Sequence, residues 1–368
     1  MEEHTKLKCM LYVNQLATVK DGKVVVIKWK EDGNGDKYPE YTQIPEGHYL
    51  RSTKFDGVRM IITSYSIESR SKMTLPNENL YIVFKHLQEY CREHDVILDG
   101  ELYSHEVDFS EIISIAMTKG TKKEIPDSVF FHCFDCLPND NLAMPFEERL
   151  ELIPTNIPRL VKVEQTPIEL NKDAEFLTHE FKRQLDLGFE GLMIRGAHKE
   201  YKFGRTTPTC GKGYKFKLYE THDAKIVGIQ QATRVISNEV DMIFRLHKEG
   251  FVDSDSEELI HEIGKKEVRK LYEEKFGSIR TTNSLGRSVT SKKKEDRIPI
   301  EMASGFFCEF EGNEVTVVLG LTDERKKEIW KNKEKYISEF CEFKSMPTTK
   351  DLPRNPGFLR MRWKSQDE

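Results

Sequence analysis

The sequence predicts a two-domain α+β protein in which a mixed first domain is followed by a small β-barrel with helical insertions. The chain has 368 residues, which is enough for about two domains at ~150 residues each. Strand-like and helix-like segments are mixed up to about residue 219, whereas from residue 222 strand-like segments are separated by charged helices. We therefore assign residues 1–219 to the first domain and residues 220–368 to the second.

The first domain shows strand and helix patterns in turn. Residues 1–50 alternate short apolar stretches with turn-rich segments, which predicts strands and loops. Residues 48–65 predict a strand, a tight turn at Asp56 and Gly57, and a second strand. Residues 78–94 have apolar residues at helical spacing and predict an amphipathic helix. Further strands are predicted at 95–104, 128–137, 191–196 and 213–219, and further helices within 146–153 and within 171–188.

The second domain is predicted as a barrel whose insertion covers residues 250–300. Strands are predicted at 222–231, 241–247, 305–320 and 357–364. Charged amphipathic helices are predicted at 257–277 and 324–337. Residues 278–298 are polar, basic and rich in Gly, Ser and Thr, and we expect a loop there.

Composition excludes several classes of protein. The chain contains no apolar run of about 18 residues, so we expect no transmembrane helix. The charged N-terminus argues against a secretory signal, and seven scattered cysteines argue against a disulfide framework. We therefore expect a soluble intracellular protein. The net charge is −5, but residues 201–368 are net positive, which is compatible with ordinary surface variation or with a nucleic-acid surface.

Lys54 is the strongest candidate for a catalytic residue. It stands at the end of a predicted strand, before the Asp56–Gly57 turn, in the sequence K-F-D-G-V-R that ends at Arg59. A neutral amine is a good nucleophile, but an ordinary lysine pKa of about 10.4 leaves little of it neutral. We therefore expect a cation or metal near Lys54. Arg59 has the fork geometry that binds phosphate. Taken by itself, the K-F-D-G-V-R motif would also fit a solvated hairpin with charged flanks.

Further motifs follow in order along the first domain. They are S-R-S-K (69–72), D-G-E-L (99–102), F-H-C-F-D-C-L (131–137), E-G-L-M-I-R (190–195) and K-F-K (215–217). In this order and spacing they resemble the covalent nucleotidyltransferases: ATP-dependent DNA ligases, RNA ligases and mRNA capping enzymes. The resemblance covers residues 48–220. It implies an adenylyltransferase domain with an ATP-grasp-like nucleotidyltransferase fold, followed by an OB-fold barrel.

The resemblance also implies roles for individual residues. Lys54 resembles the nucleophile that forms a lysine–AMP phosphoramide. Lys215 and Lys217 alternate on one predicted strand and therefore share a face; they resemble the lysines that grip the α-phosphate. Glu190 resembles a ligand of Mg²⁺ or Mn²⁺, and Glu101 resembles a residue that holds the ribose and assists the metal.

Other residues complete the predicted nucleotide and DNA contacts. Phe134 resembles the aromatic residue that stacks on adenine, although a core strand residue is the alternative. Arg70, together with Arg59, resembles the arginines that bind the 5′-phosphate of a nick. Some small ligases read the adenine amino group with a carboxylate two residues before the nucleophile, but this chain has Ser52 there.

Cys133 and Cys136 form a C-x-x-C with no second pair, and we expect buried thiols.

The C-terminal domain indicates the branch of the superfamily. The ending contains R-x-P-x-F-x-x-x-R, from Arg354 to Arg362, and is similar to the DNA-ligase terminus. There Arg362 and Lys364 would contact pyrophosphate or DNA. Trp363 stands where the family commonly has Asp, which leaves the role of Lys364 open. We also expect Lys292, Lys293 and Lys294 to approach DNA phosphates, with a solvated loop as the alternative.

Together these features resemble a small, two-domain, bacteriophage-type ATP-dependent DNA ligase. The resemblance implies ATP and Mg²⁺ or Mn²⁺ as cofactors and nicked duplex DNA as the partner. It also implies a monomer without membrane attachment, located in the cytoplasm, or in the host cytoplasm if the source is a phage. An RNA ligase or a capping guanylyltransferase is the alternative within the superfamily, and a catalytically idle nucleic-acid clamp is the alternative outside it.

Overall fold

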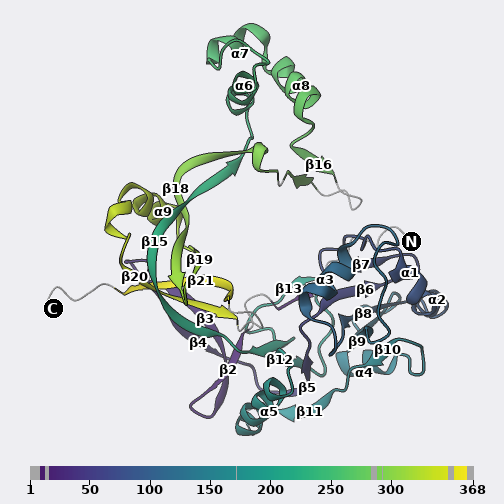
Figure 1. Ribbon diagram of the computed structural model, residues 1–368. Coiled ribbons are helices and arrows are strands. Elements are labelled where there is room, and N and C mark those ends of the chain that lie inside the picture. Colours follow the sequence, from purple (N-terminus) through teal and green to yellow (C-terminus); the bar gives the residue numbers. More distant parts are fainter. Residues whose placement is uncertain are drawn as a thin grey trace, which may run out of the picture. The chain divides into compact units, whose positions relative to one another are not determined.

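The chain divides into two compact units (Figure 1). The computed structural model describes residues 9–12, 16–170, 172–282, 288–291, 293–346 and 352–362. The first unit comprises Met1–Lys30 and Pro39–Leu218, and the second comprises Glu31–Tyr38 and Tyr219–Glu368. The segment Glu31–Tyr38 joins the second unit through hydrogen bonds that the sequence did not predict. Lys37 Nζ donates to the Phe358 carbonyl, and Asp36 accepts from the Met361 backbone N–H, both at 3.2 Å.

Two sheets form the frame of the first unit. A five-stranded sheet has the order β10-β9-β8-β6-β7, and a four-stranded sheet has the order β11-β5-β12-β14. The five-stranded sheet contains β6 (Val58–Ile62), β7 (Ile67–Ser69), β8 (Val96–Tyr103), β9 (Phe130–Pro138) and β10 (Leu160–Lys162). The four-stranded sheet contains β5 (His48–Lys54), β11 (Thr166–Glu169), β12 (Gly191–Gly196) and β14 (Tyr214–Lys217). The predicted strands of this domain are confirmed within these bounds.

The chain crosses from one sheet to the other directly after Lys54. Strand β5 ends at Lys54 and β6 begins at Val58 in the other sheet. The turn between them needs a glycine, because a Cβ on Gly57 would lie 2.3 Å from the Leu102 carbonyl oxygen. Lys54 therefore stands where the two sheets meet.

Smaller sheets border this frame. Strand β1 (Met10–Leu11) pairs in parallel with β13 (Gly204–Arg205). Strands β2 (Ala17–Lys20), β3 (Lys23–Glu31) and β4 (Lys37–Gln43) form a three-stranded sheet. The parallel pairing of β1 joins residues almost two hundred positions apart, so local sequence pattern gives no signal for it.

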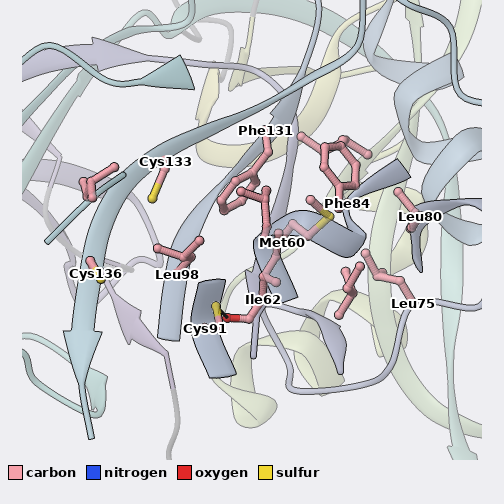
Figure 2. Packing of buried hydrophobic residues seen from close by; sticks show 14 of the residues in the cluster. Met60, Ile62, Leu75, Leu80, Phe84, Cys91, Leu98, Phe131, Cys133 and Cys136 are labelled. Atoms are coloured by element: carbon pink, nitrogen blue, oxygen red, sulfur yellow. Dashed lines mark hydrogen bonds between the residues drawn. The ribbon is translucent and has the colours of Figure 1, made fainter. Parts of the chain in front are cut away.

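Helices of the first unit cover an apolar core beside the five-stranded sheet. They are α1 (Asn79–Val83), α2 (Lys85–Glu93), α3 (Phe109–Met117) and α4 (Phe146–Glu151). Helix α5 (Ala174–Asp186) packs against the four-stranded sheet. Figure 2 shows Met60, Ile62, Leu98 and Phe131 packed with Phe84, all five without solvent exposure. The predicted helix over 78–94 is two helices that meet at Phe84, and α3 was not predicted.

The second unit is a closed β-barrel, as the sequence predicts. Its strand order is β15-β18-β19-β21-β20. The strands are β15 (Glu220–Val235), β18 (Arg297–Phe310), β19 (Asn313–Val318), β20 (Phe340–Met346) and β21 (Arg354–Arg362), and helix α9 (Asp323–Lys331) packs against β18. Alternate residues such as Ala224 and Ile226 point into the barrel core with Phe306 and Phe343.

The predicted insertion is a helical subdomain with its own core. Strands β15 and β18 continue beyond the barrel and lead to α6 (Glu239–Lys248), α7 (Glu257–Ile263) and α8 (Lys265–Phe276) (Figure 1). Its buried residues include Ile243, Leu246, Val268 and Tyr272. Two short strands, β16 (Arg280–Thr282) and β17 (Ser288–Thr290), pair within the segment predicted as a loop.

Two secondary-structure predictions in this insertion are wrong. Residues 241–247, predicted as a strand, belong to α6, because Asn238 caps the helix by accepting from Asp241 N–H and places Ile243 and Leu246 on its buried face. The predicted helix over 257–277 breaks at Gly264, whose φ of 91° no regular helix accommodates. Within the described ranges, no helix combines the length and the apolar character needed to cross a bilayer.

Candidate active site

Three lysines share one face of the four-stranded sheet. Lys54 on β5 and Lys217 on β14 both align with Gly191 on the strand between them. One step along, Ser52 and Lys215 both align with Met193. Residues aligned across a sheet, or two apart along a strand, point to the same side. The predicted nucleophile and both predicted phosphate-binding lysines are therefore brought together.

Glu190 connects two of these lysines. Its carboxylate forms an ion pair with Lys54, and it accepts from Lys217 Nζ at 3.3 Å. Its backbone N–H donates to the Lys54 carbonyl at 3.0 Å. The side chains of Lys54 and Glu190 are 21% and 14% exposed, so this pair is only partly screened by solvent.

The site lowers the pKa of Lys215. Burial, together with the charges of Lys217 and Lys54, lowers the pKa of Lys215 to about 8, while the charge of Glu190 opposes this shift. The cation that the sequence analysis expected near Lys54 is thus supplied by neighbouring lysines. Such a concentration of positive charge suits a polyphosphate.

Arg59 and Glu101 are aligned on the neighbouring strands β6 and β8. Arg59 Nε donates to Asp99 Oδ1 at 2.8 Å, and Arg59 Nη1 donates to the Met10 carbonyl at 3.0 Å. Burial raises the pKa of Glu101 to about 7, against the opposing charges of Lys54 and Arg59. Asp99, which fixes Arg59, stood in the D-G-E-L motif but was not predicted as a site residue.

A pocket of about 200 Å³ lies over these residues. Its wall includes the predicted residues Ser52, Lys54, Arg59, Arg70, Glu101, Phe134 and Lys215. It also includes residues that were not predicted for the site, namely Leu11, Tyr12, Thr53, Phe55, Met193 and Arg195. Met193 and Arg195 stood inside the quoted E-G-L-M-I-R motif, which could have identified them. Leu11 and Tyr12 reach the pocket only through the long-range pairing of β1.

Phe134 presents an aromatic ring to this pocket. The residue is 9% exposed, so it is both a buried strand residue and part of the wall. The Arg195 guanidinium lies 4.3 Å from the ring centroid, and Arg195 Nη1 donates to the Phe134 carbonyl at 3.0 Å. A cation against the ring fixes its orientation. The neighbouring Cys133 and Cys136 are free, buried thiols, as expected.

The remaining predicted contacts lie at the pocket edge or in the second unit. Arg70 is exposed and lines the pocket. Arg362, on β21, donates through Nε to Asp223 at 3.0 Å and pairs through Nη2 with Glu342 at 3.1 Å. Lys293 and Lys294 are exposed. Lys364 and Lys292 lie outside the described residues.

Two carboxylates at the site suit a divalent metal ion. Glu190 and Glu101 supply hard oxygen ligands. Glu190 forms an ion pair with Lys54, and Glu101 interacts with the charge of Lys54. Among the described residues, no group of three or more His, Cys, Asp or Glu side chains is arranged to hold a metal. Mg²⁺ commonly takes one or two protein carboxylates and completes its shell with water and phosphate oxygens. The residues present therefore fit a magnesium ion that arrives with a nucleotide.

Part of the chain is similar to known DNA ligases. Residues 40–215 match the family model of the ATP dependent DNA ligase domain. A DNA ligase of African swine fever virus is 32% identical over 116 residues, which are 30% of this chain and 26% of that protein. The chain thus spans about a quarter of the length of the curated relatives it matches.

A solved structure confirms the predicted fold class. A chain from a structure–function study of Lig E DNA ligases, described as DNA binding with a minimal scaffold, is 18% identical at a TM-score of 0.54. The match covers 85% of this chain and 92% of that chain. Together with the closed barrel, this likeness supports a nucleotidyltransferase fold followed by an OB-fold.

Proposed function

We propose that the protein is a DNA ligase that seals nicks between a 5′-phosphate and a 3′-hydroxyl in duplex DNA, and the match of residues 40–215 to the ATP dependent DNA ligase domain supports this proposal. The observation that carries this proposal is the alignment of Lys54, Lys215 and Lys217 on one sheet face beside a pocket. We assign residues 1–219 to nucleotidyl transfer and residues 220–368 to contacts with DNA.

In the first step, Lys54 Nζ attacks the α-phosphorus of ATP. A P–N bond forms, the bond from the α-phosphorus to the bridging oxygen breaks, and pyrophosphate leaves. Lys54 must lose a proton to attack, and Glu190 is the carboxylate in contact with its ammonium group. Lys215 and Lys217 neutralise charge on the triphosphate as it develops. Phe134 stacks on adenine, and Ser52 also lines the pocket.

Glu190 and Glu101 would hold the divalent metal, Mg²⁺ or Mn²⁺. When bound, such an ion neutralises charge on phosphate oxygens. Glu190 also accepts from Lys217 Nζ at 3.3 Å, so its carboxylate keeps a cationic partner when Lys54 reacts with a nucleotide. Glu101 is ionised in only part of the molecules near pH 7, because its pKa is raised to about 7.

In the later steps, AMP moves from Lys54 to the 5′-phosphate of the nick, and the 3′-hydroxyl then displaces AMP. Arg70 and Arg59 would bind the 5′-phosphate, and Arg70 has the more exposed guanidinium for this role. Arg362 and Lys364 would contact pyrophosphate or DNA, for which Arg362 must exchange its Asp223 and Glu342 partners. Lys292, Lys293 and Lys294 would contact DNA phosphates.

We also propose a monomer that works in the cytoplasm, or in that of the host if the source is a phage. All seven cysteines are free, which fits a reducing compartment. One DNA nick is engaged by one Lys54–AMP, so the chemistry needs no second copy.

Sealing of defined nicks tests the proposal. The protein is incubated with ATP, Mg²⁺ and nicked duplexes that carry DNA or RNA strands at the nick, and labelled GTP is tried in place of ATP. We expect joined DNA strands and a protein-bound AMP. Joining only of RNA strands, or a bound GMP, would contradict the proposal, and a nucleic-acid clamp without activity would acquire no adenylate.

A further inference from the structure

Arg70 stands at the tip of a tight turn that follows β7. Lys72 N–H donates to the Ser69 carbonyl, and Ser69 N–H donates to the Met73 carbonyl, both at 2.8 Å. Lys72 has a φ of 62°, a left-handed conformation that glycine adopts without strain and lysine does not. Closing the turn alone would favour glycine at this position, so the role of Lys72 must come from its side chain.

The Lys72 side chain points inward and pairs with Glu68. Both side chains are about 5% exposed, and they form an ion pair at i and i+4. Glu68 Oε1 also accepts from Ser66 Oγ at 2.8 Å. Removing one member of a buried ion pair leaves an unpaired buried charge and is strongly destabilising. The pair therefore favours the turn conformation that keeps Glu68 and Lys72 together.

The backbone between this pair carries Arg70. Arg70 is exposed and lines the same pocket as Lys54 and Lys215, and its charge is among those that lower the pKa of Lys215. The Glu68–Lys72 pair thus anchors both sides of the turn, while the residue between them reaches the proposed phosphate site.

We propose that Lys72, through its buried pairing with Glu68, is a positioning residue that holds Arg70 ready for the 5′-phosphate of the nick. The inference rests on the proposed ligase function. It predicts that Lys72 serves the transfer of AMP from protein to DNA and not the reaction of Lys54 with ATP.

The test separates the two reactions in the full-length protein. Lys72→Met is compared with Lys85→Met, which breaks an exposed pair, Lys85–Glu89, of the same i and i+4 spacing. Adenylation of Lys54 by ATP is measured first. Single-turnover transfer of AMP from pre-adenylated protein to nicked DNA is measured second. We expect Lys72→Met to keep adenylation within about twofold and to slow transfer about tenfold or more, and Lys85→Met to change neither.

A double-mutant cycle then asks whether Lys72 acts through Arg70. If it does, Lys72→Met adds nothing to the transfer defect of Arg70→Ala. Equal loss of both reactions would overturn the inference and indicate a general effect on folding. Defects that multiply in the double variant would overturn it by showing that Lys72 acts independently of Arg70. So would a transfer defect in Lys72→Met with none in Arg70→Ala. Failure of the ligase function itself would appear differently, as no adenylate on the unchanged protein.

A second variant guards against misfolding of Lys72→Met. The pair Glu68→Gln with Lys72→Met removes both charges and leaves no unpaired buried carboxylate. It is expected to show the same selective transfer defect while unfolding at a temperature near that of the parent. Normal transfer in this variant would overturn the inference.

Discussion

Lys54 and Lys217 lie at the same register position on β5 and β14, and the Glu190 carboxylate pairs with both. The strand between them contributes Gly191, so no side chain at that register position stands between the two lysines. The Glu190 carboxylate therefore pairs both with the proposed nucleophile, Lys54, and with a second cation, Lys217. The following predictions concern the residues that create this arrangement.

Gly191 is the position where the smallest change should do the most damage. Its φ is 145°, and a Cβ there would lie 2.1 Å from the Phe216 carbonyl oxygen. We expect Gly191→Ala to lose ~1–3 kcal/mol or more of stability and to abolish adenylation. Gly188→Ala is the control, because Gly188 also has a positive φ, 84°, but no atom within 4 Å of its Cβ position. Thermal unfolding and labelled-ATP capture check both variants, and equal effects would refute the steric account.

Lys215 should give nucleotide binding an alkaline limit. Its pKa is lowered to about 8 by burial and by the neighbouring lysines. Its positive charge is therefore lost as pH rises through about 8, and ATP affinity should fall over the same range. Lys215→Arg stays charged and should remove this decline. ATP affinity measured from pH 7 to 9.5 in both proteins provides the check, and an unchanged decline in Lys215→Arg would assign it to another group.

The buried carboxyl of Glu101 should make the folded protein less stable at alkaline pH than a protein with a neutral residue there. Burial raises its pKa to about 7, so the folded protein binds a proton there that the unfolded chain releases near its ordinary pKa of 4.5. The stabilising contribution is fully present below about pH 4.5 and is lost as pH rises through about 7. Glu101→Gln should therefore be more stable than the parent at pH 8, by on the order of 1–3 kcal/mol, and the gap should narrow toward pH 5.

The same Glu101→Gln variant should adenylate poorly at every pH. Denaturant unfolding at pH 5 and pH 8 measures the stability gap, and labelled-ATP capture measures the activity. A variant that is less stable than the parent at pH 8 would contradict the burial argument. Normal adenylation would contradict the assignment of Glu101 to the nucleotide site.

Phe134 should contribute stacking energy to ATP binding. Replacing the ring by Phe134→Leu should weaken ATP binding by ~1–3 kcal/mol, the usual range for a base on an aromatic side chain. Phe134→Tyr keeps the ring and is the control. Calorimetric titration with ATP in a Lys54→Met background prevents the reaction during the measurement. Equal affinity in the Leu and Tyr variants would show that the ring packs only within the protein.

The fold class could be predicted from local sequence pattern, whereas the long-range pairings around the pocket could not. The motif residues at positions 54, 101, 134, 215 and 217 lie on strands whose period and turn signals are local, and Glu190 directly precedes such a strand, β12. Leu11 and Tyr12 were not predicted as site residues. Leu11 ends β1 and Tyr12 follows it, and β1 is placed by its pairing with β13, far along the chain. Helix α6 was mistaken for a strand because a few alternating apolar residues fit both periods, and the Asn238 cap decides between them.

Mass spectrometric mapping of the adenylated protein tests the central claim most directly. The protein is incubated with ATP and Mg²⁺, digested, and searched for peptides that gain one AMP. We predict an acid-stable modification on Lys54 alone, absent from Lys54→Arg, with nick sealing lost in the same variant. AMP on another residue, or a Lys54→Arg protein that still captures AMP and joins DNA, would contradict the claim.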